Sequence, residues 1–309
     1  MMTHVPVMLN EVLELLAPKQ GASYLDCTFG GGGHTRALLE AAEGVRVVAM
    51  DCDPQAGERA EALKRKYPDR FRFCDLNFQS IDEVPEGNFS GVLMDLGISS
   101  FHVDDAERGF SFNKDAPVDM RLNPREGISG AQFLEQASED ALIEAVRDFG
   151  EERSWRRVVT AILDARGTGK LQRTTTLADL IASVISKRGF SRIHPATKTF
   201  QGIRIAVNRE LSVLAEALPK AVDKLAEGGV LAVISFHSLE DRCVKRFFKR
   251  MAGRPEHAGD SRSQMTRVAR AVLLTNRPMS ASAEEVEDNP RSRSAKLRAL
   301  KKITQEEGK

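Results

Sequence analysis

Short apolar segments alternate with helical segments through the first hundred residues, and this alternation restricts the possible fold more than any other feature. Four segments have the composition of buried strands, at residues 23–29, 45–50, 71–74 and 91–95. Helical patterns fill two of the intervals, at 34–42 and 54–67. Parallel strands need crossover connections, so this order predicts an α/β fold with a parallel sheet covered by helices on both faces.

The pattern then changes to helical signals alone, from about residue 127 to 191. Within this segment, Ser138 is placed to cap a helix that Gly150 would end. A long helix is expected at 200–225, followed by a fully apolar strand at 230–236. We expect a polar, mobile loop at 254–267 and two short edge strands within 271–303.

A helical block between two sheet strands is best explained as an insertion. We therefore expect three parts, which are the first part of the main domain at 1–126, an inserted helical domain for substrate recognition at 127–198, and the second part of the main domain, with a basic tail, at 199–309.

Several classes of protein are disfavoured by simple counts. No apolar run approaches the roughly 20 residues that span a bilayer, so we expect no membrane partner. The amphipathic, partly acidic N-terminus does not resemble a secretion signal. The cysteines are scattered without a CxxC pair, which argues against a zinc cluster or a disulfide framework. We expect a cytoplasmic protein that needs no metal; its oligomeric state is left open.

Positive charge is segregated toward the end of the chain. The net charge is only +1, yet residues 201–309 contain 21 Lys and Arg against 14 Asp and Glu. Two clusters hold six basic side chains each and no acid, at 180–209 and 291–302. Such clusters suit a polyanion, whereas the simpler interpretation of either one alone is a solvated surface. Together they favour nucleic acid.

A glycine-rich loop follows the first strand. Asp26 and Thr28 precede four glycines, residues 30–33, and Asp51 closes the next strand. Glycines allow close approach of a ligand, a helix N-terminus offers unpaired N–H groups, and an acid at the second strand can accept ribose hydroxyls. This order predicts a site for a nucleoside-containing cofactor; the alternative is a tight turn with an incidental acid.

The loop resembles one kind of cofactor site more than another. A dinucleotide site usually follows GxGxxG, whereas Asp26 with TFGGGGH resembles the S-adenosylmethionine loop of Rossmann-like methyltransferases. In that family an aromatic or polar residue after the third strand contacts adenine, and a functional loop follows the fourth strand. Phe78 and the segment that begins at Asp95 occupy those places, although Phe78 taken singly is as readily explained as a core residue.

Motifs along nearly the whole chain make the resemblance specific. Between residues 4 and 298 they read HVPVMLNEVLELL, DCTFGGGGHT, MDCDPQA, LMDLGISS, RGFSF, DMR, FGEER, HPATKTFQGIRIAVNREL, ISFHSLEDRCVKRF and NPRSRSAKLR. They resemble the RsmH (MraW) family of bacterial 16S ribosomal RNA cytosine-N4 methyltransferases. The resemblance implies a Rossmann-like methyltransferase sheet with an inserted all-helical domain, S-adenosyl-L-methionine as methyl donor, and a cytosine in the decoding region of the small ribosomal subunit as acceptor.

The resemblance also assigns cofactor contacts. By position in the family's motifs they fall on Gly32, Gly33, His34, Asp51, Phe78, Asp95 and His102. His102 stands where the family usually has glutamine, and its two ring nitrogens can still donate and accept. Gly31 replaces the family's usual arginine, which removes a charge at the rim of the loop.

The acceptor defines what catalysis requires. The lone pair of cytosine N4 is delocalised into the ring, so the enzyme must align the amine and accept its proton. Asp95, at the end of the fourth strand, is placed for that role. The (D/N/S)PP(Y/F) motif of DNA amino-methyltransferases is absent here, so His237 and Ser238 are candidates to frame the base. For Ser238 the stronger interpretation is the first residue of a capping box that ends at Asp241.

Cysteine placement separates N4 from C5 methylation. The C5 reaction needs a thiolate that adds to the ring, and no cysteine ends the fourth or fifth strand. Phosphate contacts are expected at Arg121, Lys198, Arg204 and Arg209, with ion pairs inside the fold as the alternative, and nonspecific ones along the basic tail at 291–298. The base must be turned out of its stack to reach the site.

Other functions remain as competitors. They are another methyl acceptor such as DNA or a protein glutamine, a catalytically inactive ribosome-assembly factor that kept the fold, and a nicotinamide dehydrogenase. Failure to bind the cofactor would favour the assembly factor.

Overall fold

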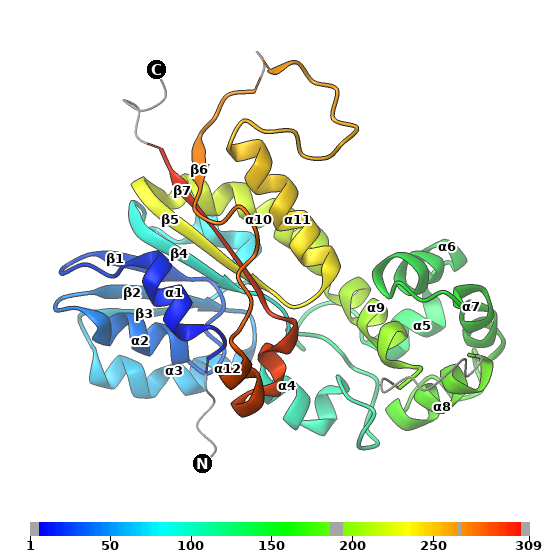
Figure 1. Cartoon of the computed structure of the whole chain (residues 1–309). Helices are drawn as coiled ribbons and strands as arrows, with labels where there is room; N and C mark the ends of the chain where they lie inside the picture. The colour runs from blue at the N-terminus through cyan, green and yellow to red at the C-terminus, as the bar shows by residue number, and fades with distance from the viewer. Residues whose placement is uncertain (1–5, 186–193, 265–266, 304–309) are drawn as a thin grey trace. The chain divides into compact units, whose positions relative to one another are not determined.

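The computed structural model describes residues 6–185, 194–264 and 267–303, and the chain divides into two compact units (Figure 1). The first unit comprises Met1–Gly97 and Leu211–Lys309, and the second comprises Ile98–Glu210. The second unit is therefore inserted, in sequence, into the first. The helical segment expected at 127–198 lies within the second unit. Three members of the first basic cluster, Lys187, Arg188 and Arg192, lie outside the described residues.

In the described part of the first unit, seven strands form one sheet in the order β3-β2-β1-β4-β5-β7-β6. The strands are β1 (Ser23–Asp26), β2 (Arg46–Asp51), β3 (Phe71–Asp75), β4 (Phe89–Asp95), β5 (Leu225–Ser235), β6 (Ala271–Leu273) and β7 (Lys296–Lys302). The first five pair in parallel, and β7 runs antiparallel to both β5 and β6. The predicted α/β class, a Rossmann-like sheet of the methyltransferase kind, is confirmed. The expectation of two edge strands is wrong for β7, which lies between β5 and β6.

Apolar side chains project alternately from the two faces of the sheet, because neighbouring residues of a strand point to opposite sides. On β4, Val92 and Met94 join one core with α10 (Glu210–Lys224) and α11 (Ser238–Met251), whereas Leu93 joins the other. That second core contains side chains of α1 (Leu9–Leu16), α2 (Gly33–Ala41) and α3 (Pro54–Lys66). Because both faces of the sheet are packed against helices, the ends of its strands are held in fixed positions. The remaining short elements of this unit are η1 (Phe78–Glu83), α12 (Ala283–Asp288) and η5 (Pro290–Ser294).

The second unit contains helices around a separate apolar core. They are α4 (Ser100–Asp104), η2 (Ala106–Arg108), α5 (Gly130–Gln136), α6 (Glu139–Ile143), the π-helical η3 (Glu144–Phe149), α7 (Trp155–Asp164), α8 (Thr174–Val184) and α9 (Thr197–Asn208). Ser138 caps α6 by accepting the Ala141 N–H, and Gly150 ends η3, as predicted. Gly202 of α9 lies against the η3 backbone, where a Cβ would be only 2.0 Å from the Ala145 carbonyl oxygen.

The long helix expected at 200–225 is two helices. Arg209 lies between α9 and α10 with φ at 52°, a left-handed conformation that ends α9. An arginine gives no local signal for such a break, since glycine and asparagine are the residues usually found there. No helix in the described ranges is long and apolar enough to span a bilayer.

Candidate active site at the glycine loop

The glycine loop joins β1 to α2 through a tight turn. Gly32, the N-cap of α2, has φ at 75°, and a Cβ on it would lie 2.7 Å from the Phe29 ring. A residue with a side chain would therefore be strained in its backbone and would also clash. Gly33 begins α2 directly after this turn. The loop lets a ligand approach the backbone closely and places a helix N-terminus beside it. Both dinucleotides and nucleoside cofactors without phosphate can bind at a loop with these two features.

Asp51 ties the loop to the end of β2. Its Oδ2 accepts the N–H of Gly30 at 2.8 Å, and its Oδ1 accepts the N–H of Asp53 at 2.9 Å. Arg59 closes the arrangement by donating to the Gly30 carbonyl oxygen at 2.8 Å and to Asp53 at 3.1 Å. Because a carboxylate oxygen can accept more than one hydrogen bond, Asp51 can shape the loop and still accept ribose hydroxyls.

Asp26 is buried beneath the loop and holds it from below. One oxygen accepts the Thr28 N–H at 3.1 Å, and the other accepts the Thr35 hydroxyl at 2.6 Å. Burial raises the pKa of the Asp26 carboxyl above its ordinary value, although the threonine contacts oppose the shift. Thr35, which the sequence analysis missed, lies in the first turn of α2. Its hydroxyl bond to Asp26 joins this helix to the end of β1.

Asp95 ends β4 beside the loop. Its N–H donates to the Thr28 hydroxyl at 2.7 Å, and its Oδ2 lies 3.7 Å from His34 Nδ1. The Oδ1 atom is buried, and within the described ranges it has no hydrogen-bond partner. Burial, with the nearby charges of Asp26 and Glu240, raises the pKa of Asp95 well above its usual range. An unsatisfied buried acceptor is costly, so this oxygen is suited to a ligand's donor.

His34 is held in one orientation by the N-terminal segment. It is buried, and its Nε2 lies 3.0 Å from the Val7 carbonyl oxygen. Only a nitrogen that carries a hydrogen can donate to a carbonyl, so Nε2 carries one, and Nδ1 is the ring nitrogen that faces Asp95. The structure thus brings together five of the predicted cofactor residues, namely Gly32, Gly33, His34, Asp51 and Asp95.

The two remaining predicted contacts lie on different units. Phe78 begins η1 shortly after β3 and packs, half-buried, against the sheet core. His102 lies on α4 of the second unit, where its Nδ1 accepts the Ser99 N–H at 3.1 Å. Its ring also packs against Phe110, with the centroids 5.4 Å apart. Both assignments stay predictions.

The capping box of α11 is one residue earlier than expected. His237, not Ser238, is the N-cap, and its Nδ1 accepts the Glu240 N–H at 3.4 Å. Glu240 in turn accepts the N–H groups of Phe236 and His237, and one of its oxygens lies 3.2 Å from His237 Nε2. Histidine is an uncommon cap, which explains why the serine was favoured. The substrate-side role of His237 stays a prediction.

Three of the four cysteines have a thiol pKa above the ordinary value. Burial raises the pKa of Cys27, Cys74 and Cys243 above the ordinary value, and for Cys27 the charge of Asp26 adds to the effect. A raised pKa disfavours the thiolate that C5 methylation requires. This agrees with the preference for an amine acceptor.

The predicted phosphate contacts differ in what they bind within the fold. Arg121 forms two hydrogen bonds of 2.8 Å with Asp119, and Arg204 forms two of 2.8 Å with Glu210. For these two arginines the alternative, an internal ion pair, is what the structure contains. Lys198 is exposed and donates to a backbone carbonyl at 3.1 Å. Arg209 is exposed.

The basic tail is partly structural as well. Arg298 is buried in β7 and pairs with Asp241 of α11 through contacts of 2.7 and 3.2 Å. Lys302 donates to backbone carbonyls at the end of α10 and the start of β5. Arg298 is therefore unsuited to the nonspecific phosphate contacts expected at 291–298, because its charge is used inside the first unit.

Comparison with known proteins gives a consistent picture. The model of the MraW methylase family matches residues 1–303. A protein of Parvibaculum lavamentivorans named ribosomal RNA small subunit methyltransferase H is 47% identical over 305 residues, which cover 97% of this chain and 89% of that one. A protein of the same name from Thermomicrobium roseum is 45% identical, covering 97% and 94%. An rRNA methylase structure from Streptococcus thermophilus has a TM-score of 0.44 at 11% identity, covering 98% of this chain and 100% of that one.

Proposed function

The chain belongs to the MraW methylase family, and from this we propose that it transfers a methyl group from S-adenosyl-L-methionine to the N4 amine of a cytosine in 16S ribosomal RNA. We further propose that the cytosine lies in the decoding region and is modified in the small ribosomal subunit, in the cytoplasm. The names of the curated relatives support small-subunit ribosomal RNA as the substrate.

The observation that carries the proposal is the buried Oδ1 of Asp95 at the carboxyl end of β4, which has no hydrogen-bond partner among the residues that the structure describes. Methyl transfer to N4 requires an acceptor for the amine proton, and an acceptor works best when its pKa is raised toward the working pH. The pKa of Asp95 is raised in that direction by burial. Asp95 therefore orients the amine through a hydrogen bond and accepts its proton.

The residues of the glycine loop and of the neighbouring strand ends are suited to binding S-adenosylmethionine. Asp51 accepts the ribose hydroxyls, the Gly32–Gly33 backbone allows close approach, and Phe78 provides an apolar wall for adenine. His34 and His102 complete the set of cofactor contacts. The bound cofactor supplies a methyl group on a positively charged sulfur, so the chain's own task is to align the amine for in-line transfer and to exclude water.

Substrate binding falls to other residues. We assign phosphate contacts to Lys198 and Arg209, which are exposed, and positioning roles to Arg121 and Arg204, whose ion pairs shape the segments beside them. The inserted segment 127–198 serves substrate recognition, and His237 borders the base. Turning the cytosine out of its stack makes its amine accessible.

The test uses small ribosomal subunits from a strain that lacks this protein, with labelled S-adenosylmethionine and with naked 16S RNA as the parallel sample. Label in the RNA of the subunits is the expected result. Cofactor binding without transfer to either sample would contradict the RNA acceptor. Neither binding nor transfer would favour a catalytically inactive assembly factor.

A further inference from the structure

One face of α11 carries a row of exposed arginines. Arg242, Arg246 and Arg250 follow one another at four-residue intervals and are all exposed. Side chains four residues apart lie on the same side of a helix, about 6 Å from one another along its axis. Lys245 and Lys249 add two further charges, and no acid occurs between residues 242 and 250. We call the three arginines the α11 row.

The row borders a shallow groove of about 320 Å³ within the first unit. Apolar side chains of α10 and α11 line it together with the row, among them Leu218, Leu239 and Phe247. The Arg250 guanidinium lies 5.3 Å from the centre of the Phe247 ring, within the range of a cation–π contact. The groove therefore combines an apolar floor with a positively charged edge.

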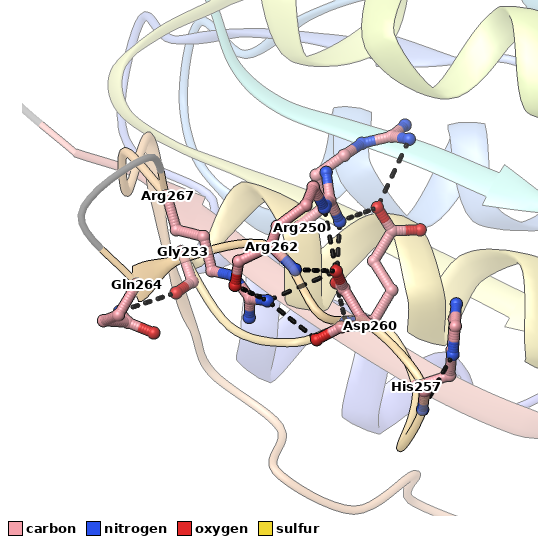
Figure 2. Close-up of polar contacts among 9 residues, drawn as sticks. Arg250, Gly253, His257, Asp260, Arg262, Gln264 and Arg267 are labelled. Carbon is pink, nitrogen blue, oxygen red and sulfur yellow. Dashed lines mark hydrogen bonds and ion pairs between the residues drawn. The ribbon is translucent and has the colours of Figure 1, made fainter.

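The acid at this groove, Glu256, is held in an arginine cluster, which Figure 2 shows in the loop after α11. Arg262 contacts both Glu256 and Asp260 at 2.7 Å, and Arg250 lies 3.7 Å from Glu256. Arg267 lies 3.2 Å from Asp260, whose pKa is held well below its usual range by the Arg262 guanidinium. The Glu256 N–H donates to Asp260 at 3.0 Å, which fixes the turn.

This cluster adds internal contacts to the polar loop expected at 254–267, whose mobility stays a prediction. No regular helix or strand of more than a single bridge occurs in its described part, but Asp260 ties it together through side-chain and backbone contacts. Arg262 contacts both acids of the loop at 2.7 Å, so the nearest cation of Glu256 is Arg262 and not Arg250 of the row, which lies 3.7 Å away.

We propose that the α11 row and its groove form a docking surface for an unpaired strand of RNA, with phosphates on the arginines and bases over the apolar floor. The inference rests on the proposed function, whose substrate is RNA. Arginines bind phosphate through paired N–H groups, and their spacing is one that successive phosphates of an extended strand can match. Three arginines and one acid, Glu256, line the groove, so its charged edge favours an anionic partner.

The first experiment measures binding of a fluorescent single-stranded oligoribonucleotide of mixed sequence at several salt concentrations. The triple variant R242A/R246A/R250A is compared with K19A/R36A/R65A, which removes three exposed charges elsewhere in the same unit. Each phosphate contact on a single strand contributes about 0.7 to the slope of log K against log salt. We expect the triple variant to lose about 2 from the slope and roughly tenfold or more in affinity at low salt, and the control to match the wild type.

A second readout uses the wild-type chain. Cys243 lines the groove and is half-buried, as is Cys52, which lies outside it. Bound oligoribonucleotide should protect Cys243 from a maleimide, detected by peptide mass spectrometry, and leave Cys52 as reactive as before.

The outcomes separate this inference from the proposed function. Equal RNA affinity and slope for both triple variants, or unprotected Cys243, would overturn the docking surface. Loss of binding to whole subunits with unchanged oligoribonucleotide affinity would instead indicate an acidic protein partner and would also overturn it. A wild-type chain that binds the oligoribonucleotide but does not methylate subunits would overturn the proposed function alone.

Discussion

The packing of α9 on η3 leaves no room for a side chain at Gly202, so Gly202→Ala should destabilise the second unit. A Cβ there would lie 2.0 Å from the Ala145 carbonyl oxygen and 2.8 Å from the Gly150 nitrogen, whereas ordinary contacts begin at 3.4 Å. The Ala145 backbone would have to retreat by about 1.4 Å, the difference between 3.4 and 2.0 Å. Overpacking typically costs about 1–3 kcal/mol, and rigid backbone on both sides places this case at the upper end or above it. Since alanine recovers about 1 kcal/mol of helix propensity, we expect a net loss of about 2 kcal/mol or more.

Gly57→Ala in α3 is the matched control. Its Cβ would lie 3.5 Å from the Phe73 ring, an ordinary contact, so the substitution should stabilise its helix by about 0.5–1 kcal/mol. Trp155, the single tryptophan of the chain, belongs to α7 and reports on the second unit by fluorescence during urea unfolding. The Trp155 midpoint should fall for Gly202→Ala and not for Gly57→Ala. A Gly202→Ala midpoint at or above the wild-type value would refute the packing argument.

Three further substitutions test the site and its support. Asp51→Ala removes the acceptor for the Gly30 N–H as well as a ribose contact, so cofactor affinity measured by calorimetry should fall about tenfold or more; unchanged affinity would reject the assignment. Asp95→Asn should lower methyl transfer by about 100-fold or more. The folded-state pKa of Asp95 is raised, so its contribution to stability is present in acid and is lost as pH rises through that pKa. In urea titrations the Asp95→Asn variant should therefore be more stable than wild type at neutral pH and equal to it below about pH 4. A loss of stability at neutral pH would contradict the raised pKa. Arg298→Met removes the nearer partner of the partly buried Asp241, which Lys296 approaches only to 3.8 Å, and should cost about 1–3 kcal/mol of unfolding free energy; a cost near zero would return Arg298 to the exposed basic tail.

The sheet and the loop could be predicted because their signals are local. Strands that are buried on both faces appear as short apolar runs, and the polar residues that end them, Asp26, Asp51 and Asp95, mark the carboxyl edge where ligands bind in such sheets. Gly30 and Gly32 also follow from backbone requirements, because both have a positive φ. These features need no knowledge of partners distant in the sequence.

The remaining features depend on tertiary contacts. The left-handed Arg209 and the histidine cap at His237 break the usual residue preferences, so no pattern indicated them. The pairing of Arg204 with Glu210 depends on the chain turning between two helices, and that of Arg298 depends on β7 entering the sheet beside β5. A basic residue has the same appearance in a sequence whether its charge faces RNA or a buried carboxylate.

The identity of the methylated nucleoside tests the central claim most directly. Small subunits from a strain lacking the protein would be incubated with the wild-type chain and labelled S-adenosylmethionine, and the 16S RNA digested and resolved by mass spectrometry. We predict N4-methylcytidine, mapped to a fragment of the decoding region and missing when Asp95→Asn replaces the wild type. Label on cytosine C5, on another base, or on protein would contradict the account.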